Sequence, residues 1–328
     1  MLVTCEPVSL PRPAHGLCLA LGMFDGVHLG HQHVLRHALV HAANGAGASV
    51  ALTFDPHPMA VVRPAQAPRL LQTLPQRLRA LEALGLDATL VIPFDATVAS
   101  QTGEEFIRGL LRDTGRIRSL SVGEGFQFGC RRSGDVQLLR NLGAEFRFQV
   151  HAAPSVSIGG DVVSSSRIRQ CIRDGALESA SELLGRPYAV SGKVISGDQM
   201  GRTLGFPTAN LDVSGLELPP HGVYAVWVQR IARNQEYPAV LNLGTRPTLN
   251  VDHRELRFEV HVLDFDSDLY GEELEVTFAN RLREERRFPD SIALRNQIAE
   301  DIAAARKLLD APGPTPGPGV AGSPEFRA

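Results

Sequence analysis

Cysteine is scarce in this chain and widely scattered. The 328 residues include four cysteines, Cys5, Cys18, Cys130 and Cys171. They lack both the paired spacing of a zinc site and the density of a disulfide framework. The cysteine pattern therefore argues against a small secreted domain and indicates a reducing compartment.

Two further absences narrow the class of protein. No stretch approaches the ~18 apolar residues of a membrane span, and the N-terminus lacks the basic start and apolar run of a signal peptide. The formal net charge is −3, and the arginines are spread among acidic residues instead of forming a basic stripe. We therefore expect a cytoplasmic protein with no nucleic-acid or membrane partner; no pattern indicates an oligomeric state.

What remains is an ordinary globular composition, with 43% apolar and 21% charged residues. The length exceeds the roughly 250 to 300 residues at which single cores stop growing, which favours two domains. From Leu17 to Gly185, short apolar runs such as ALTF and LVIPF alternate with segments of helical period, for example 75–85 and 102–111. This alternation predicts a Rossmann-like α/β domain with a parallel sheet over residues 1–185.

The second half has a different hydrophobic pattern. Five short β-branched or alternating runs between Tyr188 and Phe278, separated by Gly, Pro, Asn and Asp, predict a small closed β-barrel. A closing helix behind an Asp290/Ser291 cap is expected to pack across it through one apolar face, Leu294, Ile298, Ile302, Ala305 and Leu309. We assign residues 186–310 to this second domain and predict a disordered Pro/Gly-rich tail over 311–328.

The first chemical motif follows the first buried strand, where LCLALG runs into GMFDGVHLGH and then into a helix. Glycines allow close approach of a phosphate, and the helix N-terminus offers free N–H groups. His28 and His31 can donate to phosphoryl oxygens and stabilise the charge of a transition state. A zinc site is poorly supported, because the motif offers no convincing third ligand. Three following histidines are interpreted as surface polarity: His33, His37 and His41.

A second phosphate-binding element is predicted in VVSSSRIRQCI. Ser164, Ser165 and Ser166 cap a helix whose first turns carry Arg167 and Arg169. Hydroxyl groups and an arginine fork at a helix start suit a phosphate. A purely structural serine cap is the alternative, but the HxGH motif of the same predicted sheet favours function.

The barrel half contains a glycine-rich segment, SGDQMGRTLGFPTAN. It does not match the phosphate cradle of P-loop proteins, yet its glycines permit backbone contact with phosphates. The Thr208 hydroxyl and the Asn210 amide oxygen are hard ligands suited to Mg²⁺. An ordinary connector with a Pro-Thr turn is the alternative reading of the segment.

These motifs together resemble a known family. FDGVHLGH with a late SSSRIR resembles the nucleotidyltransferase superfamily, and TFDPHP and VGEGFQFG narrow this to the FMN adenylyltransferase half of bacterial FAD synthetases. GRTLGFPTANL, HGVYAV, NLGTRPT, FEVHVLDFDSDLYG and LREERRF resemble, in order and spacing, the riboflavin kinase domain. The resemblance implies a six-stranded split barrel with a C-terminal helix behind the α/β domain, and ATP, riboflavin, FMN and Mg²⁺ as substrates and cofactor.

The resemblance also implies roles for individual residues. Glu259 is expected inside the barrel mouth as the general base for the riboflavin hydroxyl, with a solvated strand glutamate as the alternative. Its neighbours Phe258 and Val260 are expected to face the opposite side. His28, His31 and Arg169 become the catalytic group of adenylylation. The implied nucleotide ligands are Gly22, Phe24, Asp25, Gly26, Gly30, Ser164, Ser165, Ser166, Gly201, Gly205, Pro207 and Thr208. The implied flavin contacts are Phe54, Phe126, Phe128, Asn242 and Arg295. The alternatives are core packing for the aromatics, turn structure for Asn242 and a solvated helix position for Arg295.

Two positions depart from the family pattern. Met23 stands where the family usually has Asn, and Gly125 stands where it has Asp or Asn. A lost substrate hydrogen bond at Gly125 weakens binding by about 0.5–1.5 kcal/mol. The sequence therefore predicts a bifunctional enzyme of FAD biosynthesis, with two alternatives: a riboflavin kinase with a weakened adenylyltransferase site, and a flavin-binding regulatory module.

Overall fold

The computed structural model describes residues 1–45, 47–197, 205–246 and 255–310. Contacts divide these residues into two compact units, one formed by 1–69 with 74–165, the other by 70–73 with 166–310. Within the described ranges, no helix has the length and apolar character needed to span a bilayer.

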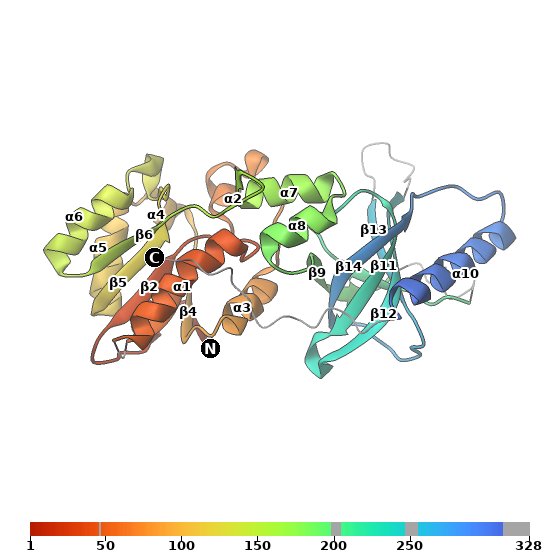
Figure 1. Ribbon diagram of the computed structural model, residues 1–328, viewed down its shortest axis with the longest axis horizontal. Coiled ribbons are helices and arrows are strands. Elements are labelled where there is room, and N and C mark those ends of the chain that lie inside the picture. Colours follow the sequence, from red (N-terminus) through yellow and green to blue (C-terminus); the bar gives the residue numbers. More distant parts are fainter. Residues whose placement is uncertain (46, 198–204, 247–254, 311–328) are drawn as a thin grey trace. The chain divides into compact units, whose positions relative to one another are not determined.

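The first unit is built on a parallel sheet (Figure 1). Its strands follow the order β1-β4-β3-β2-β5-β6, and every pairing between them is parallel. The predicted parallel sheet is thereby confirmed. Strands buried on both faces need nearly continuous apolar runs, which the central strands β2, β3 and β4 have. Their bounds are β1 (Leu2–Thr4), β2 (Leu17–Leu21), β3 (Ala48–Asp55), β4 (Ala88–Pro93), β5 (Ile117–Gly123) and β6 (Gln149–Ala153).

Helices cover both faces of this sheet. Leu19 of β2 belongs to a core shared with α5 and α6, whereas Cys18 and Ala20 belong to a second core with α1 and α3. Thr102 caps α5 through a reciprocal capping box with Glu105, as the Thr cap predicted. The helices are α1 (Leu29–Ala43), α2 (Pro58–Val62), α3 (Leu74–Ala83), α4 (Ala96–Ser100), α5 (Gly103–Thr114) and α6 (Val136–Phe146).

The second unit is a closed six-stranded antiparallel barrel, in the order β10-β13-β12-β11-β14-β9. Periodicity alone predicts only five of these strands, because β10 is four residues long and follows a proline. The family resemblance supplies the sixth, and the barrel is confirmed. The strands are β9 (Ala189–Ile195), β10 (Ala209–Asp212), β11 (Gly222–Arg230), β12 (Gln235–Arg246), β13 (Glu255–Val262) and β14 (Glu273–Arg283).

The two sides of the barrel wall are distinguished by their contacts. The rings of Phe258 on β13 and Phe278 on β14 lie 6.4 Å apart although these strands are not neighbours, so this contact crosses the interior. On the outer side, Val223 and Ala225 pack with Ala305 of α10 (Ser291–Leu308). Asp290 caps that helix as predicted. Helices α7 (Ser165–Arg173) and α8 (Leu177–Leu184) precede the barrel; from Ser166 onward they group with it.

Candidate functional site

The turn between β2 and α1 is strained. Phe24, Gly26 and Val27 have φ angles of 51°, 88° and 41°. A positive φ is rare for a β-branched residue such as Val27, and such strain concentrates at functional sites. The turn thus places the start of α1 directly after the carboxyl end of a buried strand, where anions bind in open parallel sheets.

His28 and His31 form one stacked unit at that helix start. His28 is the N-cap of α1, and its Nδ1 accepts a hydrogen bond of 3.2 Å from the backbone N–H of His31. The two rings stack with centroids 3.6 Å apart. A Cβ on Gly30 would lie 3.2 Å from the His28 ring, so glycine lets the ring fold back over the helix. Because Nδ1 accepts, the neutral His28 ring carries its proton on Nε2 and can donate there.

The carbonyl groups of the turn are held from three other segments. Thr53 Oγ1 and Arg77 Nη1 each donate to the Met23 carbonyl at 2.8 Å, and Ser165 Oγ donates to the Asp25 carbonyl at 3.0 Å. Arg77 is 1% exposed, and burial lowers its pKa against the opposing charges of Asp25 and Asp55. The predicted Ser165 and the GMFDG motif therefore meet, as expected from the SSSRIR element.

Arg77 is a residue that sequence reasoning missed. It lies on α3 one helical turn before the buried Leu81, so an arginine occupies the apolar face of that helix. Its guanidinium also reaches the Phe54 carbonyl at 3.3 Å and the Asp55 carboxylate at 3.5 Å. A charged residue in register with an apolar stripe was the available signal.

The predicted flavin aromatics belong to a larger cluster. Phe126 and Phe128 stack with centroids 5.4 Å apart, and Phe106 joins Phe54 to Phe128 at 5.9 and 6.4 Å. Phe94 lies edge-on to Phe54 at 5.6 Å. All five rings are partly buried, and Phe54, Phe106, Phe126 and Phe128 pack on the core beneath α5 and α6. The sequence identified three of the five; Phe94 and Phe106 carry no motif of their own.

The other residues predicted in this unit lie in the turn and at the start of α7. A Cβ on Gly22 would meet the Phe24 ring at 2.8 Å, so that glycine serves the turn itself. Ser164 is half-buried and Ser166 is exposed at the start of α7. Arg169 lies one turn further along α7 and is 7% exposed.

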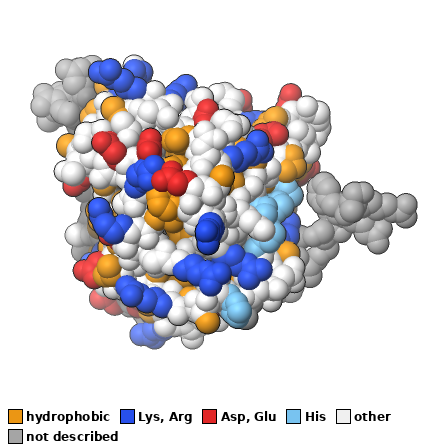
Figure 2. All heavy atoms as spheres, turned by 90° about the vertical axis from the view of Figure 1, so that its left-hand side faces the viewer, with side chains coloured by type: hydrophobic (Ala, Val, Ile, Leu, Met, Phe, Trp, Pro, Cys, Tyr) orange, Lys and Arg blue, Asp and Glu red, His pale blue; other side chains and the backbone are white. Residues whose placement is uncertain are grey.

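Three histidines of α1 require a correction. His33, His37 and His41 were interpreted as surface polarity, but all three are half-buried and contact one another in sequence along the helix. His151 of β6 stacks on His41 at 3.8 Å and lies 6.2 Å from His37. Figure 2 shows histidines gathered beside Lys and Arg side chains on one face of this unit. The rings stack instead of converging, and among the described residues no cluster of His, Cys, Asp and Glu can hold a metal ion.

In the barrel, three predicted polar residues share one row across adjacent strands. Asn210 of β10 and Asn242 of β12 each lie directly opposite Glu259 of β13. Directly paired residues point to the same side of a sheet. Phe258 and Val260 are 2% and 0% exposed, so the prediction that they face away from Glu259 is confirmed.

The position of this row corrects one expectation. Glu259 was expected inside the barrel mouth; because Phe258 points to the interior, Glu259 instead faces outward from the wall. Its carboxylate lies 3.9 Å from Arg257, and its side chain is 19% exposed. A Cβ on Gly197 would lie 2.1 Å from the Asn210 amide nitrogen, so glycine makes room for that amide.

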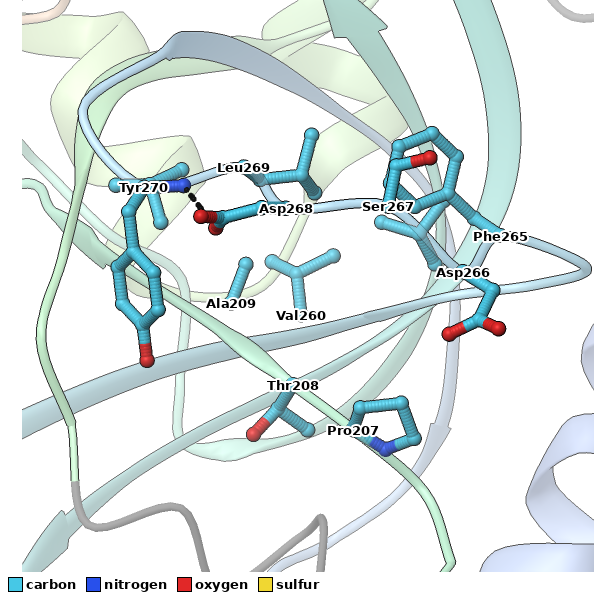
Figure 3. Close-up of a pocket in the computed structure, with 12 residues that line it drawn as sticks. Pro207, Thr208, Ala209, Val260, Phe265, Asp266, Ser267, Asp268, Leu269 and Tyr270 are labelled. Carbon is cyan, nitrogen blue, oxygen red and sulfur yellow. Dashed lines mark hydrogen bonds between the residues drawn. The ribbon is translucent and has the colours of Figure 1, made fainter.

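A pocket of about 560 Å³ lies on the opposite side of β13 (Figure 3). Ala209 and Val260 point into it, facing the loop of residues 265–270, and Thr208 lies beside them. Its volume falls within the usual range for small-molecule sites, and its lining is largely apolar. Sequence reasoning quoted the run FDSDLYG but assigned it no site. The lining it missed is Val194, Ala209, Val260, Val262, Phe265, Asp266, Ser267, Asp268, Leu269 and Tyr270.

The other residues predicted in the barrel unit do not all lie at one place. Pro207 and Thr208 line the pocket, whereas Gly205, with φ of 89°, is exposed ahead of them. Arg295 is an exposed residue of α10. Gly201 and the tail over 311–328 lie outside the described residues.

Known families match two consecutive parts of this chain. A family model described as FAD synthetase matches residues 11–167, and one described as riboflavin kinase matches residues 184–309. A solved structure described as a macrolide-efflux protein from Streptococcus pneumoniae is similar in fold, with a TM-score of 0.78 and 30% identity over 93% of this chain and 98% of that one.

Curated relatives match over nearly their whole length. A protein of Escherichia coli strain K12 is 38% identical over 297 residues, which cover 90% of this chain and 94% of the relative. A protein of Haemophilus influenzae is 36% identical over 299 residues, covering 91% and 96%. Both carry the name bifunctional riboflavin kinase/FMN adenylyltransferase.

Proposed function

Since the chain belongs to the family of bifunctional riboflavin kinase/FMN adenylyltransferases, we propose that it converts riboflavin to FMN and FMN to FAD. Both steps are ATP-dependent group transfers, so the chain is a transferase. The barrel unit phosphorylates riboflavin, and the α/β unit adenylylates FMN. The domain boundary at residues 185/186 remains our prediction; the riboflavin kinase match begins at residue 184, whereas the FAD synthetase match ends at residue 167.

The row of Asn210, Glu259 and Asn242 is the observation that carries the kinase assignment. In this step a primary hydroxyl oxygen of riboflavin attacks the γ-phosphorus of ATP, the bond to the ADP oxygen breaks, and the hydroxyl proton passes to the Glu259 carboxylate. We assign the apolar pocket to the base of ATP, because Thr208 connects it to Asn210. Asn242 and Arg295 are proposed to contact the flavin.

The oxygen ligands present fit Mg²⁺. Thr208 and Asn210 offer a hydroxyl and an amide oxygen two residues apart, and the missing Cβ of Gly197 leaves space at that amide. When bound, Mg²⁺ neutralises charge on the transferring phosphates. Thr208 and Asn210 orient the phosphates toward Glu259, and no covalent intermediate with the protein is needed.

The adenylylation step is proposed to occur at the strained turn. A phosphate oxygen of FMN attacks the α-phosphorus of a second ATP, and pyrophosphate leaves. His28 and His31 donate to phosphoryl oxygens, the helix start contributes its N–H groups, and Arg169 stays a predicted phosphate ligand. The phenylalanine cluster around Phe54 provides an apolar surface for the flavin ring.

The proposal also covers the cellular compartment and the partners of the enzyme. We propose a cytoplasmic enzyme, supported by four cysteines that are all free in the structure. Its partners are proposed to be small molecules, namely riboflavin, FMN and ATP, with no nucleic acid or membrane.

The test follows the flavins over time. Purified protein is incubated with riboflavin, ATP and Mg²⁺, and riboflavin, FMN and FAD are separated by chromatography. Wild-type protein is expected to form FMN and then FAD. Glu259→Gln removes the base but keeps the shape, and is expected to lower FMN formation by about 10²–10⁴-fold. Glu236→Gln, on an exposed part of β12, is the matched control.

The second variant isolates the adenylyltransferase. Asparagine is a good N-cap, so His28→Asn keeps the start of α1 while removing the imidazole. It is expected to stop the reaction at FMN, with a loss of about 10²–10³-fold in FAD formation. FMN as the only wild-type product would leave a monofunctional kinase, and flavin binding without ATP consumption would leave a regulatory module.

A further inference from the structure

The imidazole of His261 points to a role that no motif had indicated. We infer that His261 is a positioning residue of the kinase site: it holds the segment that carries Thr208 and Asn210. This inference rests on the proposed kinase function. His261 Nδ1 lies 2.7 Å from the Pro207 carbonyl oxygen. A carbonyl oxygen only accepts, so Nδ1 carries the proton and donates it to this bond.

The strand register places His261 beside the site. His261 follows Glu259 by two residues on β13, and alternate residues of a strand point to the same side. The imidazole therefore shares the outward face with the proposed base. Strand β13 thus presents the proposed general base, Glu259, and, two residues further along, the imidazole of His261 that holds the segment before β10.

The backbone ladder explains why a side chain is needed at this point. β10 pairs with β13 at Ala209 and Asn210, and Pro207 lies just before that pairing begins. Proline has no N–H to donate, so it cannot extend the ladder with both of its groups. The hydrogen bond from His261 to Pro207 therefore extends the contact between β10 and β13 two residues beyond the last paired residue, Ala209.

A second contact fixes the ring. Phe206 lies edge-on to the His261 ring with centroids 5.8 Å apart and an interplanar angle of 84°. The imidazole is half-buried between this ring and the carbonyl oxygen. Both neighbours of the ring belong to the segment directly before Thr208, so the ring orients that segment and not a distant loop.

The consequence is a link between His261 and Mg²⁺ use. If the Pro207 carbonyl is released, Thr208, which precedes the paired residues of β10, loses its fixed spacing from Asn210 and Glu259. A displacement of about 1 Å in a catalytic group lowers the rate of the chemical step far more than it lowers the affinity for a part of the substrate bound elsewhere. We therefore expect loss of the donor to lower kcat and to raise the Mg²⁺ requirement, while the barrel itself stays folded.

The experiment compares two substitutions of nearly equal size and shape. His261→Asn keeps an N–H donor close to the position of Nδ1, whereas His261→Leu removes it. His261→Leu is expected to lower kcat/KM for riboflavin phosphorylation about tenfold or more and to raise the half-activating Mg²⁺ concentration several-fold. His261→Asn is expected to stay within about threefold of wild type on both measures.

Two readouts in the same samples serve as controls. FMN adenylylation reports on the other unit, and fluorescence of the only tryptophan, Trp227 on β11, reports barrel folding. Gln229→Ala removes a side-chain hydrogen bond at the β11–β12 hairpin and is expected to leave the kinase unchanged. Equal losses in the Asn and Leu variants, unchanged kinetics in Leu, or unfolding of the barrel in both would overturn the positioning role. A wild-type protein that forms no FMN would instead overturn the proposed function.

Discussion

Gly125 lies in an exposed loop after β5 with open space around it. An added Cβ at Gly125 would meet nothing within 4 Å, and no left-handed φ is required there. We expect Gly125→Asn to fold normally and to raise kcat/KM for FMN adenylylation roughly two- to twelvefold, the effect of one restored hydrogen bond. Initial rates with FMN and ATP measure the effect, and Gly123→Asn, at the carboxyl end of β5 two residues earlier, is the control. An unchanged rate would mean that the family's side chain at this position has no counterpart in this site.

Arg77 illustrates a buried charge that organises a site. Arg77→Met leaves the Met23 and Phe54 carbonyls without this donor, and each such loss costs about 1–3 kcal/mol. We expect the α/β unit to be destabilised by about 3 kcal/mol or more and FAD formation to fall, while FMN formation continues. Urea unfolding followed by circular dichroism gives the midpoint.

Arg108 supplies the matched control for that substitution. It is exposed and pairs on the surface with Glu104 and Glu145, and such pairs contribute little to stability. Arg108→Met is expected to leave the midpoint near that of wild type. Equal shifts for Arg77→Met and Arg108→Met would contradict the role given to burial.

The histidine array between α1 and β6 makes one helix sensitive to pH. Burial, reinforced by neighbouring cations, lowers the pKa of His33, His37 and His151 below the usual 6.5. The folded state therefore binds fewer protons than the unfolded state just below that pH, so the stability contribution is complete above about 6.5 and is lost as pH falls. We expect the urea midpoint of the α/β unit to be lower at pH 5.5 than at pH 7.5.

Variants assign this pH dependence to the array. His37→Gln removes a titrating group from its centre and is expected to flatten the dependence, whereas His15→Gln, at an exposed position, is expected to preserve it. The ratio of midpoints at the two pH values is the measurement. A wild-type slope in His37→Gln would show that the acid sensitivity arises elsewhere.

The elements differ in how far the sequence predicts them. Strands such as β3 are continuous apolar runs and helices such as α5 have a cap and a stripe, so their type follows from local pattern. β10 escapes periodicity because four residues after a proline contain no period to detect. The aromatic cluster and the histidine array unite separate segments, and no local pattern specifies such contacts. In the same way, GxHxGH and PTAN identified the sites, whereas His261 emerges only from its contacts and Arg77 offers only the weak signal of a charge on an apolar helix face.

At the scale of the whole molecule, the chain is not divided at a single point. Residues 70–73 belong to the barrel unit although the flanking segments belong to the α/β unit. The Leu70 N–H donates to the Gly215 carbonyl and the Leu70 carbonyl accepts from the Glu217 N–H, both at 2.8 Å. Leu71, the next residue, is completely buried. A cut at residue 185 therefore separates the barrel from part of its own structure.

This arrangement predicts that a substitution within residues 70–73 destabilises the barrel, whose strands lie much later in the sequence. Leu71→Ala is expected to destabilise the barrel unit by about 2–5 kcal/mol, although 70–73 precede the barrel strands by more than a hundred positions. Trp227 fluorescence in urea measures the effect. Leu81→Ala, an equally buried leucine in the core of the α/β unit, is the control and is expected to leave the Trp227 midpoint unchanged. A shift confined to Leu81→Ala would contradict the grouping.

The excursion at Leu70 also affects the order of events during synthesis. A ribosome adding about 5–20 residues per second needs roughly 7–30 s to make the ~145 residues between Leu70 and its partner Gly215. Late in that interval Leu70 and Leu71 lie outside the exit tunnel while the backbone groups of Gly215 and Glu217 that will pair with Leu70 do not yet exist. Once Ser165 has been made, the nascent chain carries the apolar segment 70–73 within an otherwise complete α/β unit until Gly215 and Glu217 follow. During this period a chaperone that recognises short apolar stretches can bind the segment.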